Sequence, residues 1–380
     1  MAHGAVDGFI RDGFEPVRAV FESNLAGEAE VGASFCATRE GETVVDLWGG
    51  FADAVRTRPW EKDTIVNVYS ITKTMTALCA LILADRGELD FDAPVARYWP
   101  QFAANGKADI KVSHLMSHAS GLSGWAEPVT NEDLYDWEKM TSLLAAQAPF
   151  WAPGTAPGYH AVTQGYLVGE VVRRITGRSL GTFFRQEVAE PLGADFHIGL
   201  PASEDGRVAE LIAPAPAEPA VNVQQTALQA NVSNNPGINV PFHGTRAWRG
   251  AEIPAAGGTG NARSIAEVHV ILANGGVAKG KRFLTEAGCR KALELQIEGD
   301  DLILGMPARF GMGFGLAGGI VPLPSDSSIF WAGYGGSLAV IDMDARTTVA
   351  YAMNKLAGPA LGDARGFGLA MAAWQALALA

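Results

Sequence analysis

The sequence predicts a protein of the α+β class (mixed α/β), in which one sheet is flanked by helices and interrupted by a large, mainly helical part. Three observations lead to this prediction. Strand-like runs occur near both ends of the chain, helical periodicity dominates the middle, and the 380 residues contain no internal repeat. We therefore expect a single unit, residues 1–380, whose sheet is built from both ends of the chain.

The N-terminal region predicts one helix followed by a β-hairpin. Phe9, Val17 and Phe21 recur at roughly helical spacing, so we expect an amphipathic helix over residues 9–25. Residues 33–39 and 43–52 are strand-like, and the short turn around Gly41 joins them as a hairpin.

From Ser70 the spacing of apolar residues changes to steps of three and four, which predicts a helix that ends near Gly87. Further helices are expected at residues 113–118 and 162–176, the second closing at Gly177.

Prolines alternate with alanine and glutamate in residues 213–220, which excludes a regular helix and predicts a linker or loop. The C-terminal part predicts three strands and a final alanine-rich helix, at residues 328–331, 337–342, 348–354 and 367–379. We expect the sheet part to comprise approximately residues 1–65 and 280–380, and the mainly helical part approximately 66–279.

Composition and charge exclude several classes of protein. Hydrophobic residues make up 48% and charged residues 18% of the chain, which excludes intrinsic disorder as a description of the whole. The net charge of −12 lacks the positive field that attracts nucleic acid or an anionic membrane, so we expect neither as a partner. The longest apolar run, residues 77–84, is too short to cross a bilayer.

The start of the chain and its cysteines bear on location. Residues 1–8 have neither the basic nor the apolar region of a secretory signal, so we expect a cytoplasmic protein unless a leader was removed. Cys36, Cys79 and Cys289 are odd in number, far apart and match no metal spacing. They predict buried free thiols in a reducing compartment.

Ser70-Ile-Thr-Lys73 is the motif with the clearest chemistry, and it is the only S-x-x-K in the chain. On a helix, three residues equal nearly one turn, so both side chains point the same way. A lysine whose pKa is lowered by burial can accept the proton of a serine hydroxyl and make it a nucleophile. The free N–H groups at the start of the helix favour an oxyanion beside Ser70.

With this motif the chain resembles the penicillin-recognising serine enzymes, in particular the class C β-lactamase-like group that includes family VIII carboxylesterases. Four further segments carry the resemblance in the expected order: residues 112–122, Pro153-Gly154, Tyr159-His160-Ala161 and residues 165–172. The resemblance covers most of the chain. It implies a β-lactamase/transpeptidase-like fold with an antiparallel sheet.

The resemblance implies a role for each catalytic residue. Ser70 corresponds to the acylated nucleophile, Lys73 to its proton partner and Tyr159 to a second member of the proton relay. A cationic Lys73 nearby would favour the Tyr159 phenolate and make it a base at neutral pH. The backbone N–H groups of Ser70 and Tyr334 correspond to the oxyanion hole. The glycines on either side of Tyr334 let the backbone approach a substrate closely.

The sequence departs from the family at two places that recognise polar substrates. Trp331, in Trp331-Ala-Gly333, stands where many relatives have a cation, and Ala161 stands where they have an asparagine. Both changes favour an uncharged ester over a penicillin or peptide. Expected substrate-binding residues are Trp331, Gly333 and His160 within these motifs, together with Trp151 and Trp248, for which a core position is the alternative.

The function that follows is a serine carboxylesterase acting on short- to medium-chain esters through an acyl-enzyme on Ser70. Alternatives with the same site are an acyltransferase, an amidase or a weak β-lactamase, and a further alternative is a non-catalytic binding relative. We expect no metal or organic cofactor: His114 and His118 lie one helical turn apart but lack a third ligand, which favours packing or capping. The partner is a small-molecule ester, and the sequence does not predict the oligomeric state.

Overall fold

The structure is a computed structural model that describes residues 4–27, 29–214, 225–357 and 363–379. Its largest feature is a nine-stranded sheet with the order β1-β3-β2-β13-β12-β11-β10-β9-β8. All neighbouring strands in this sheet run antiparallel. The described strands are β1 Val6–Ile10, β2 Gly32–Arg39, β3 Glu42–Gly50, β4 Val66–Asn67, β5 Thr259–Gly260, β6 Val277–Ala278, β7 Lys281–Arg282, β8 Ile297–Asp300, β9 Pro307–Phe310, β10 Gly315–Leu316, β11 Ser328–Ala332, β12 Leu338–Asp342 and β13 Thr347–Met353.

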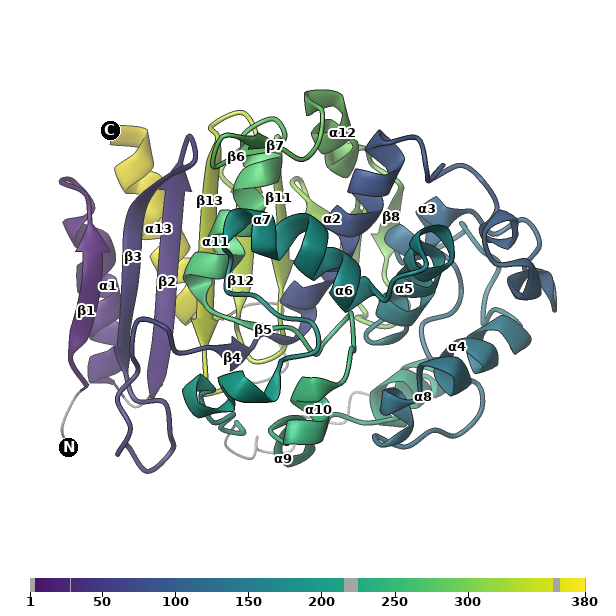
Figure 1. Cartoon of the computed structure of the whole chain (residues 1–380), viewed down its shortest axis with the longest axis horizontal. Helices are drawn as coiled ribbons and strands as arrows, with labels where there is room; N and C mark the ends of the chain where they lie inside the picture. The colour runs from purple at the N-terminus through teal and green to yellow at the C-terminus, as the bar shows by residue number, and fades with distance from the viewer. Residues whose placement is uncertain (1–3, 28, 215–224, 358–362, 380) are drawn as a thin grey trace.

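Most of the helices lie between β4 and β8 in the chain and form the mainly helical half (Figure 1). The described α-helices are α1 Glu15–Ala26, α2 Thr72–Asp85, α3 Val112–Met116, α4 Trp137–Ala146, α5 Thr163–Thr176, α6 Leu180–Phe184, α7 Glu190–Leu192, α8 Ala227–Asn234, α9 Val240–His243, α10 Arg246–Gly250, α11 Ala262–Ala273, α12 Glu286–Arg290 and α13 Ala364–Leu379. The predicted fold class, an antiparallel sheet with helices around it and a large helical part, is confirmed.

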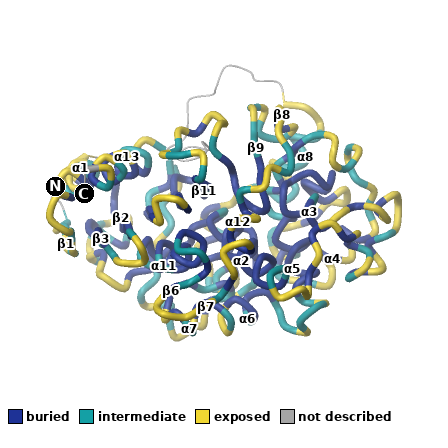
Figure 2. The backbone as a smooth tube through the Cα atoms, turned by 90° about the horizontal axis from the view of Figure 1, so that it is seen from above, coloured by how far each residue is buried: buried dark blue, intermediate teal, exposed yellow. Residues whose placement is uncertain are grey.

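The N-terminal and C-terminal segments of the chain meet in the interior of the sheet, where β2 pairs with β13. Phe35 stands opposite Tyr351 in this pair, and both strands are buried along almost their whole length. Successive side chains of a strand point to opposite faces, so burial of all of them requires cover on both faces. Helices α1 and α13 cover one face and α11 covers the other (Figure 2).

The predicted N-terminal helix over residues 9–25 is wrong in its first part. Residues Val6–Ile10 form the edge strand β1, in which Phe9 pairs with Asp46 and remains exposed. The chain then turns at Gly13, whose φ of +92° suits glycine, before α1 begins at Glu15 with Pro16 in its first turn. Hydrogen bonding to β3 therefore overrides the helical spacing that the apolar residues suggest.

Helix α2 is the centre of the helical half. All of its residues from Thr72 to Leu83 are buried, because α5, α6 and α12 pack around it. A helix that is apolar over most of its surface is stable only when it is enclosed in this way. The enclosed helix therefore holds the side chains of its first turn in a fixed position.

The other predicted elements have mixed outcomes. The hairpin β2–β3, the helices α2, α3 and α5, the strands β11 to β13 and the helix α13 are confirmed within a few residues, and Gly177 caps α5 with a φ of +69°. Helix α11, which falls within residues 66–279, packs mainly on the sheet, against β2, β12 and β13. Of the predicted linker at 213–220, the residues from 215 on lie outside the described part of the chain.

Candidate active site

Ser70 stands in a sharp turn between strand β4 and helix α2. The turn is a single 3₁₀ turn, Tyr69–Ile71, in which Tyr69 has a φ of +46°. This left-handed conformation costs a residue with a Cβ on the order of 1–3 kcal/mol and persists only where the surroundings hold it. Here the Tyr69 N–H donates to Asn67 Oδ1 (3.3 Å), and the Tyr69 hydroxyl lies 3.2 Å from Nδ1 of His243.

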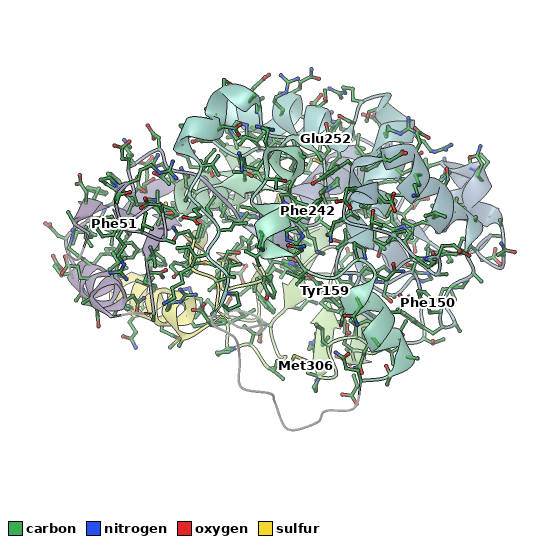
Figure 3. The ribbon with its side chains drawn as sticks, turned by 90° about the horizontal axis from the view of Figure 1, so that it is seen from below. Phe51, Phe150, Tyr159, Phe242, Glu252 and Met306 are labelled. Atoms are coloured by element: carbon green, nitrogen blue, oxygen red, sulfur yellow. The ribbon has the colours of Figure 1, made fainter. Side chains whose placement is uncertain are left out.

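The side chains of Lys73 and Tyr159 meet at the Ser70 hydroxyl. Lys73, one helical turn after Ser70, places Nζ 3.1 Å from Ser70 Oγ. Tyr159, just before α5, donates a hydrogen bond from its hydroxyl to the same oxygen (2.7 Å). In Figure 3, Tyr159 lies near the middle of the molecule, between Phe242 and Met306. The three residues that the sequence predicts as catalytic therefore form one hydrogen-bonded group.

Lys73 is fully buried and has backbone carbonyls as its other partners. Its Nζ donates to the carbonyl oxygens of Ala161 (2.6 Å) and Ala255 (3.0 Å), and within the described residues no carboxylate forms an ion pair with it. Burial holds the pKa of Lys73 well below its usual value. A neutral amine donates its two N–H groups to these carbonyls and keeps its lone pair for the Ser70 hydroxyl proton.

Tyr159 is predominantly protonated at neutral pH. Burial raises its pKa to about 12, although the hydrogen bond with Ser70 and the nearby Trp331 indole act in the opposite direction. The sequence argument, in which a cationic Lys73 favours the phenolate, is therefore reversed. Burial favours the uncharged form of both groups, the amine of Lys73 and the phenol of Tyr159.

The expected oxyanion hole lies where the sheet meets the nucleophile turn. Within the described residues, the backbone N–H groups of Ser70 and Tyr334 have no hydrogen-bond acceptor. Gly333 brings the end of β11 against this turn: a Cβ on Gly333 would lie 2.3 Å from the Val68 carbonyl oxygen and 2.1 Å from Ser337 Oγ. Ser337 Oγ itself donates to the Val68 carbonyl (2.9 Å). The two free N–H groups are thus held by a close backbone contact.

A pocket with a volume of about 150 Å³ opens beside Ser70. Among the described residues, no side chain with a formal charge at neutral pH lines it, because burial lowers the pKa of His243 to about 4. Most of the lining is apolar or aromatic: Tyr69, Ser70, Asn131, Leu134, Tyr159, Ala161, Val162, Pro236, Gly237, Ile238, His243, Trp248, Ala256, Leu304, Ala332, Gly333 and Tyr334.

The five expected substrate-binding residues divide into two groups. Gly333 and Trp248 line the pocket. His160, Trp151 and Trp331 do not line it, and each is held by other side chains or backbone groups.

These three residues pack beside Tyr159 or belong to the group around its neighbour His160, outside the pocket lining. His160 is buried, with its ring nitrogens bonded to the Gly158 carbonyl and to Ser120 Oγ. Trp151 packs edge-on against the His160 ring. Trp331 stacks on His118 and lies 6.0 Å, between ring centroids, from Tyr159. An indole in place of the family's cation thus enters an aromatic cluster and does not reach the substrate side.

The sequence argument missed several pocket residues from distant segments. His243 bonds to Tyr69 and stacks on Trp248 with 3.9 Å between ring centroids. Leu304 reaches the pocket from the loop between β8 and β9, and Pro236 to Ile238 from the loop after α8. None of these belongs to a recognisable motif, so only the tertiary structure brings them to Ser70.

Two further histidines and the three cysteines have structural surroundings. His114 Nδ1 accepts a hydrogen bond from the Lys111 N–H at the start of α3, and His118 is fully buried. Among the described residues, no three His, Cys, Asp or Glu side chains come together as a metal site. The three cysteines are buried and free. Over the same residues, no helix has the length and apolar character needed to cross a bilayer.

Comparison with known proteins identifies the family. The sequence model of the beta-lactamase family matches residues 17–371. The chain belongs to the beta-lactamase family. It is an enzyme of the serine hydrolase type. The resemblance predicted from Ser70, Lys73 and the later motifs is therefore confirmed.

Individual members of the beta-lactamase family resemble the chain over most of its length. It is 36% identical to the esterase/beta-lactamase LipL of Mycobacterium tuberculosis over 362 residues, which are 91% of this chain and 82% of LipL. It also resembles the crystal structure of a family VIII carboxylesterase, with a TM-score of 0.93 and 44% identity over 98% of this chain and 100% of the other. A penicillin-binding protein homologue from Caulobacter crescentus has a TM-score of 0.92 and 39% identity over the same shares.

The contact at Gly333 gives a testable prediction. We expect Gly333→Ala to lower kcat for a short-chain ester about 100-fold, because the new methyl group pushes β11 and the Tyr334 N–H away from Ser70 by roughly 1 Å. Gly319→Ala is the matched control, since the nearest atom to its Cβ is 3.9 Å away. Steady-state kinetics measures kcat of both variants, and thermal unfolding measures their stability. More than half of the native kcat in Gly333→Ala would contradict the role given to this contact.

Proposed function

We propose that this enzyme is a carboxylesterase that hydrolyses short- to medium-chain esters through an acyl-enzyme on Ser70. The observation that carries the proposal is the Ser70 hydroxyl, contacted by an uncharged, buried amine and by a protonated phenol at the edge of an apolar pocket. The relatives named as an esterase and as a family VIII carboxylesterase support it. The reaction needs a small-molecule ester and water.

In the acylation step, Ser70 Oγ attacks the ester carbonyl carbon while the Ser70 proton moves to the lone pair of Lys73 Nζ. The carbonyl oxygen gains the negative charge and accepts hydrogen bonds from the N–H groups of Ser70 and Tyr334. The carbon–oxygen bond to the alcohol then breaks. Tyr159, whose hydroxyl is adjacent to Ser70 Oγ, donates its proton to the departing alkoxide, and the Lys73 ammonium restores the tyrosine proton.

In the deacylation step, water attacks the acyl carbon and gives one proton to the neutral amine of Lys73. The bond to Ser70 Oγ breaks, the oxygen takes that proton back, and the carboxylic acid leaves. Both steps require a neutral Lys73 and a protonated Tyr159 at the start. The pKa shifts of the two groups support this state, because burial lowers the pKa of Lys73 and raises that of Tyr159.

The pocket supports the choice of an uncharged, short- to medium-chain ester. Its described lining offers no cation to hold the carboxylate of a penicillin, since Trp331 lies in the aromatic cluster behind Tyr159. Ala161 contributes a methyl group where relatives have an amide. Apolar surface gains about 25 cal/mol per Å² when a substrate covers it, which favours alkyl and aryl groups. The volume of about 150 Å³ limits their size.

Paired kinetics on a short-chain p-nitrophenyl ester and a chromogenic cephalosporin test the proposed function. We expect rapid ester cleavage by the native enzyme and little lactam turnover. Ser70→Ala should reduce ester turnover by about five or six powers of ten, since the nucleophile is lost. Stoichiometric labelling of the native enzyme by a fluorophosphonate is the accompanying control.

Two results would overturn this proposal in different ways. Near-normal ester cleavage by Ser70→Ala would remove Ser70 as the nucleophile. Efficient cephalosporin turnover would show that the positions of Trp331 and Ala161 do not exclude lactams. LipL, named both esterase and beta-lactamase, makes the lactam arm of this test informative.

The alkaline side of the pH profile tests the state of Tyr159. Because its pKa is about 12, Tyr159 stays protonated, and we expect kcat/KM of the native enzyme not to fall between about pH 8 and pH 10. Tyr159→Phe should lower kcat by about two to four powers of ten. A native profile that declines with a midpoint near 10 would contradict a raised pKa of Tyr159.

A further inference from the structure

Asp301, directly after β8, makes contacts that its position in the sequence does not explain. Its side chain is 1% exposed, and Oδ1 accepts three backbone N–H groups: those of Ile303 (2.8 Å), Leu304 (2.8 Å) and Tyr159 (3.0 Å). The first two donors are local and form the usual turn around an aspartate. The third is the backbone of the tyrosine that touches Ser70, 142 residues away.

A second hydrogen bond joins the same two segments. The Leu302 N–H donates to the Pro157 carbonyl (2.9 Å), next to the bond between Asp301 and Tyr159. The loop 301–305 and the segment 157–159 are therefore connected at two adjacent points. The Asp301 N–H and the Gly305 N–H close this loop through the carbonyls of Met306 and Asp301.

The loop also carries part of the pocket wall. Leu304, whose N–H is held by Asp301, lines the pocket beside Ser70. The carbonyl of Ile303 accepts from Gln229 Nε2 (3.3 Å) on α8. One carboxylate oxygen thus fixes both a wall of the pocket and the backbone of Tyr159.

The chain provides a comparison for an aspartate with only a structural role. Asp342, at the end of β12, is also buried and accepts the N–H groups of Asp344 (3.0 Å) and Ala345 (2.8 Å) through Oδ1. Its other partners are the hydroxyls of Ser325 and Ser328, and it does not line the pocket. Asp301 differs from Asp342 in that one of its donors belongs to the catalytic group.

The second oxygen of Asp301, Oδ2, is buried and has no hydrogen-bond partner within the described residues. An unpaired buried polar atom is unfavourable and persists where another contact of the same group compensates for it. The three bonds to Oδ1 provide this compensation. No ion pair of Asp301 occurs among the described residues. Its contacts with Tyr159 are the backbone hydrogen bond to Oδ1 and its nearby negative charge, which contributes to the raised pKa of Tyr159.

From these contacts we propose that Asp301 is a positioning residue for the reaction, which holds the Tyr159 hydroxyl at Ser70 Oγ and, through Leu304, sets the shape of the pocket. This inference rests on the proposed esterase function. It assigns two separable effects to one side chain. The link to Tyr159 acts on kcat, and the link to Leu304 acts on KM for acyl chains that reach this wall.

A double-mutant cycle tests this inference with esters of increasing chain length. We expect Asp301→Ala to lower kcat about 100-fold, since a displacement of roughly 1 Å at Tyr159 has a cost of this size. In a Tyr159→Phe background the same change should lower kcat less than about threefold, because the hydroxyl that it positions is already absent. The change in KM for the longer esters should remain in both backgrounds.

Two further variants separate positioning from general stability. Asp301→Asn keeps an oxygen for the three N–H donors and should retain at least about a tenth of native kcat. Asp342→Ala is the matched control: it should lower the thermal unfolding temperature and leave kcat within about twofold of native. If Asp301→Ala is too unstable to purify, Asp301→Glu, which displaces the carboxylate by one methylene, replaces it in the cycle. Its kcat should fall about tenfold or more in the native background only.

The outcomes distinguish this inference from the proposed function. Native enzyme that does not hydrolyse the esters overturns both. Ester hydrolysis that requires Ser70 and Tyr159 but is unaffected by Asp301→Ala, or an effect of the same size with and without the Tyr159 hydroxyl, overturns the positioning role alone. Loss of kcat that disappears in Tyr159→Phe and is rescued by Asp301→Asn supports it.

Discussion

The burial of the Lys73 amine, with carbonyl groups and no carboxylate as partners among the described residues, is the constraint on which the site depends. An ammonium without a counter-charge is unfavourable there, so burial lowers the pKa of Lys73 and favours the neutral amine, whose lone pair can accept the Ser70 proton. This environment requires the segments that carry Ala161 and Ala255 to close over α2. Gly165 permits it, because a Cβ at that position would lie 2.5 Å from the Ala255 nitrogen. The packing of the helical half is therefore also what determines the charge of the base.

The site lies at the junction of the two halves of the fold. The helical half supplies Ser70, Lys73 and Tyr159, and the end of β11 supplies Gly333 and the free N–H of Tyr334. The junction is held by the backbone approach at Gly333 and by the hydrogen bond from Ser337 Oγ to the Val68 carbonyl, so the proposed oxyanion donors are fixed relative to Ser70 before substrate binds. Such preorganised donors stabilise the transition state without a cost of reorientation during the reaction. The apolar pocket between the halves then selects the uncharged ester proposed above.

Local patterns in the sequence predict those parts of the molecule that depend on local physics. The spacing of Ser70 and Lys73 on one helical turn, the glycines Gly87 and Gly177 at helix ends and the apolar runs of β11 to β13 all require only neighbouring residues. The strand β1 was missed because pairing with β3, and not its own periodicity, stabilises it. The strands β8 to β10 were missed because they contain only two to four residues each, too few for a periodic pattern. The same reason explains the residues of the site that no motif indicates. Asp301 meets Tyr159 across 142 residues, and the protonation states of Lys73 and Tyr159 follow from burial that only the tertiary structure creates.

The rate at which a fluorophosphonate labels Ser70, measured as a function of pH, tests most directly whether Lys73 is an uncharged base. The reagent phosphorylates Ser70 Oγ and releases fluoride, so its rate reports the ionisation of the base in the free enzyme without a binding step for an ester. The account predicts a rate that reaches its plateau well below pH 10.5, the usual pKa of a lysine, and a plateau at least about a hundredfold lower in Lys73→Ala. A rate that keeps rising about tenfold per pH unit up to pH 10.5 would contradict it, because Lys73 would then be an ordinary, charged lysine at neutral pH.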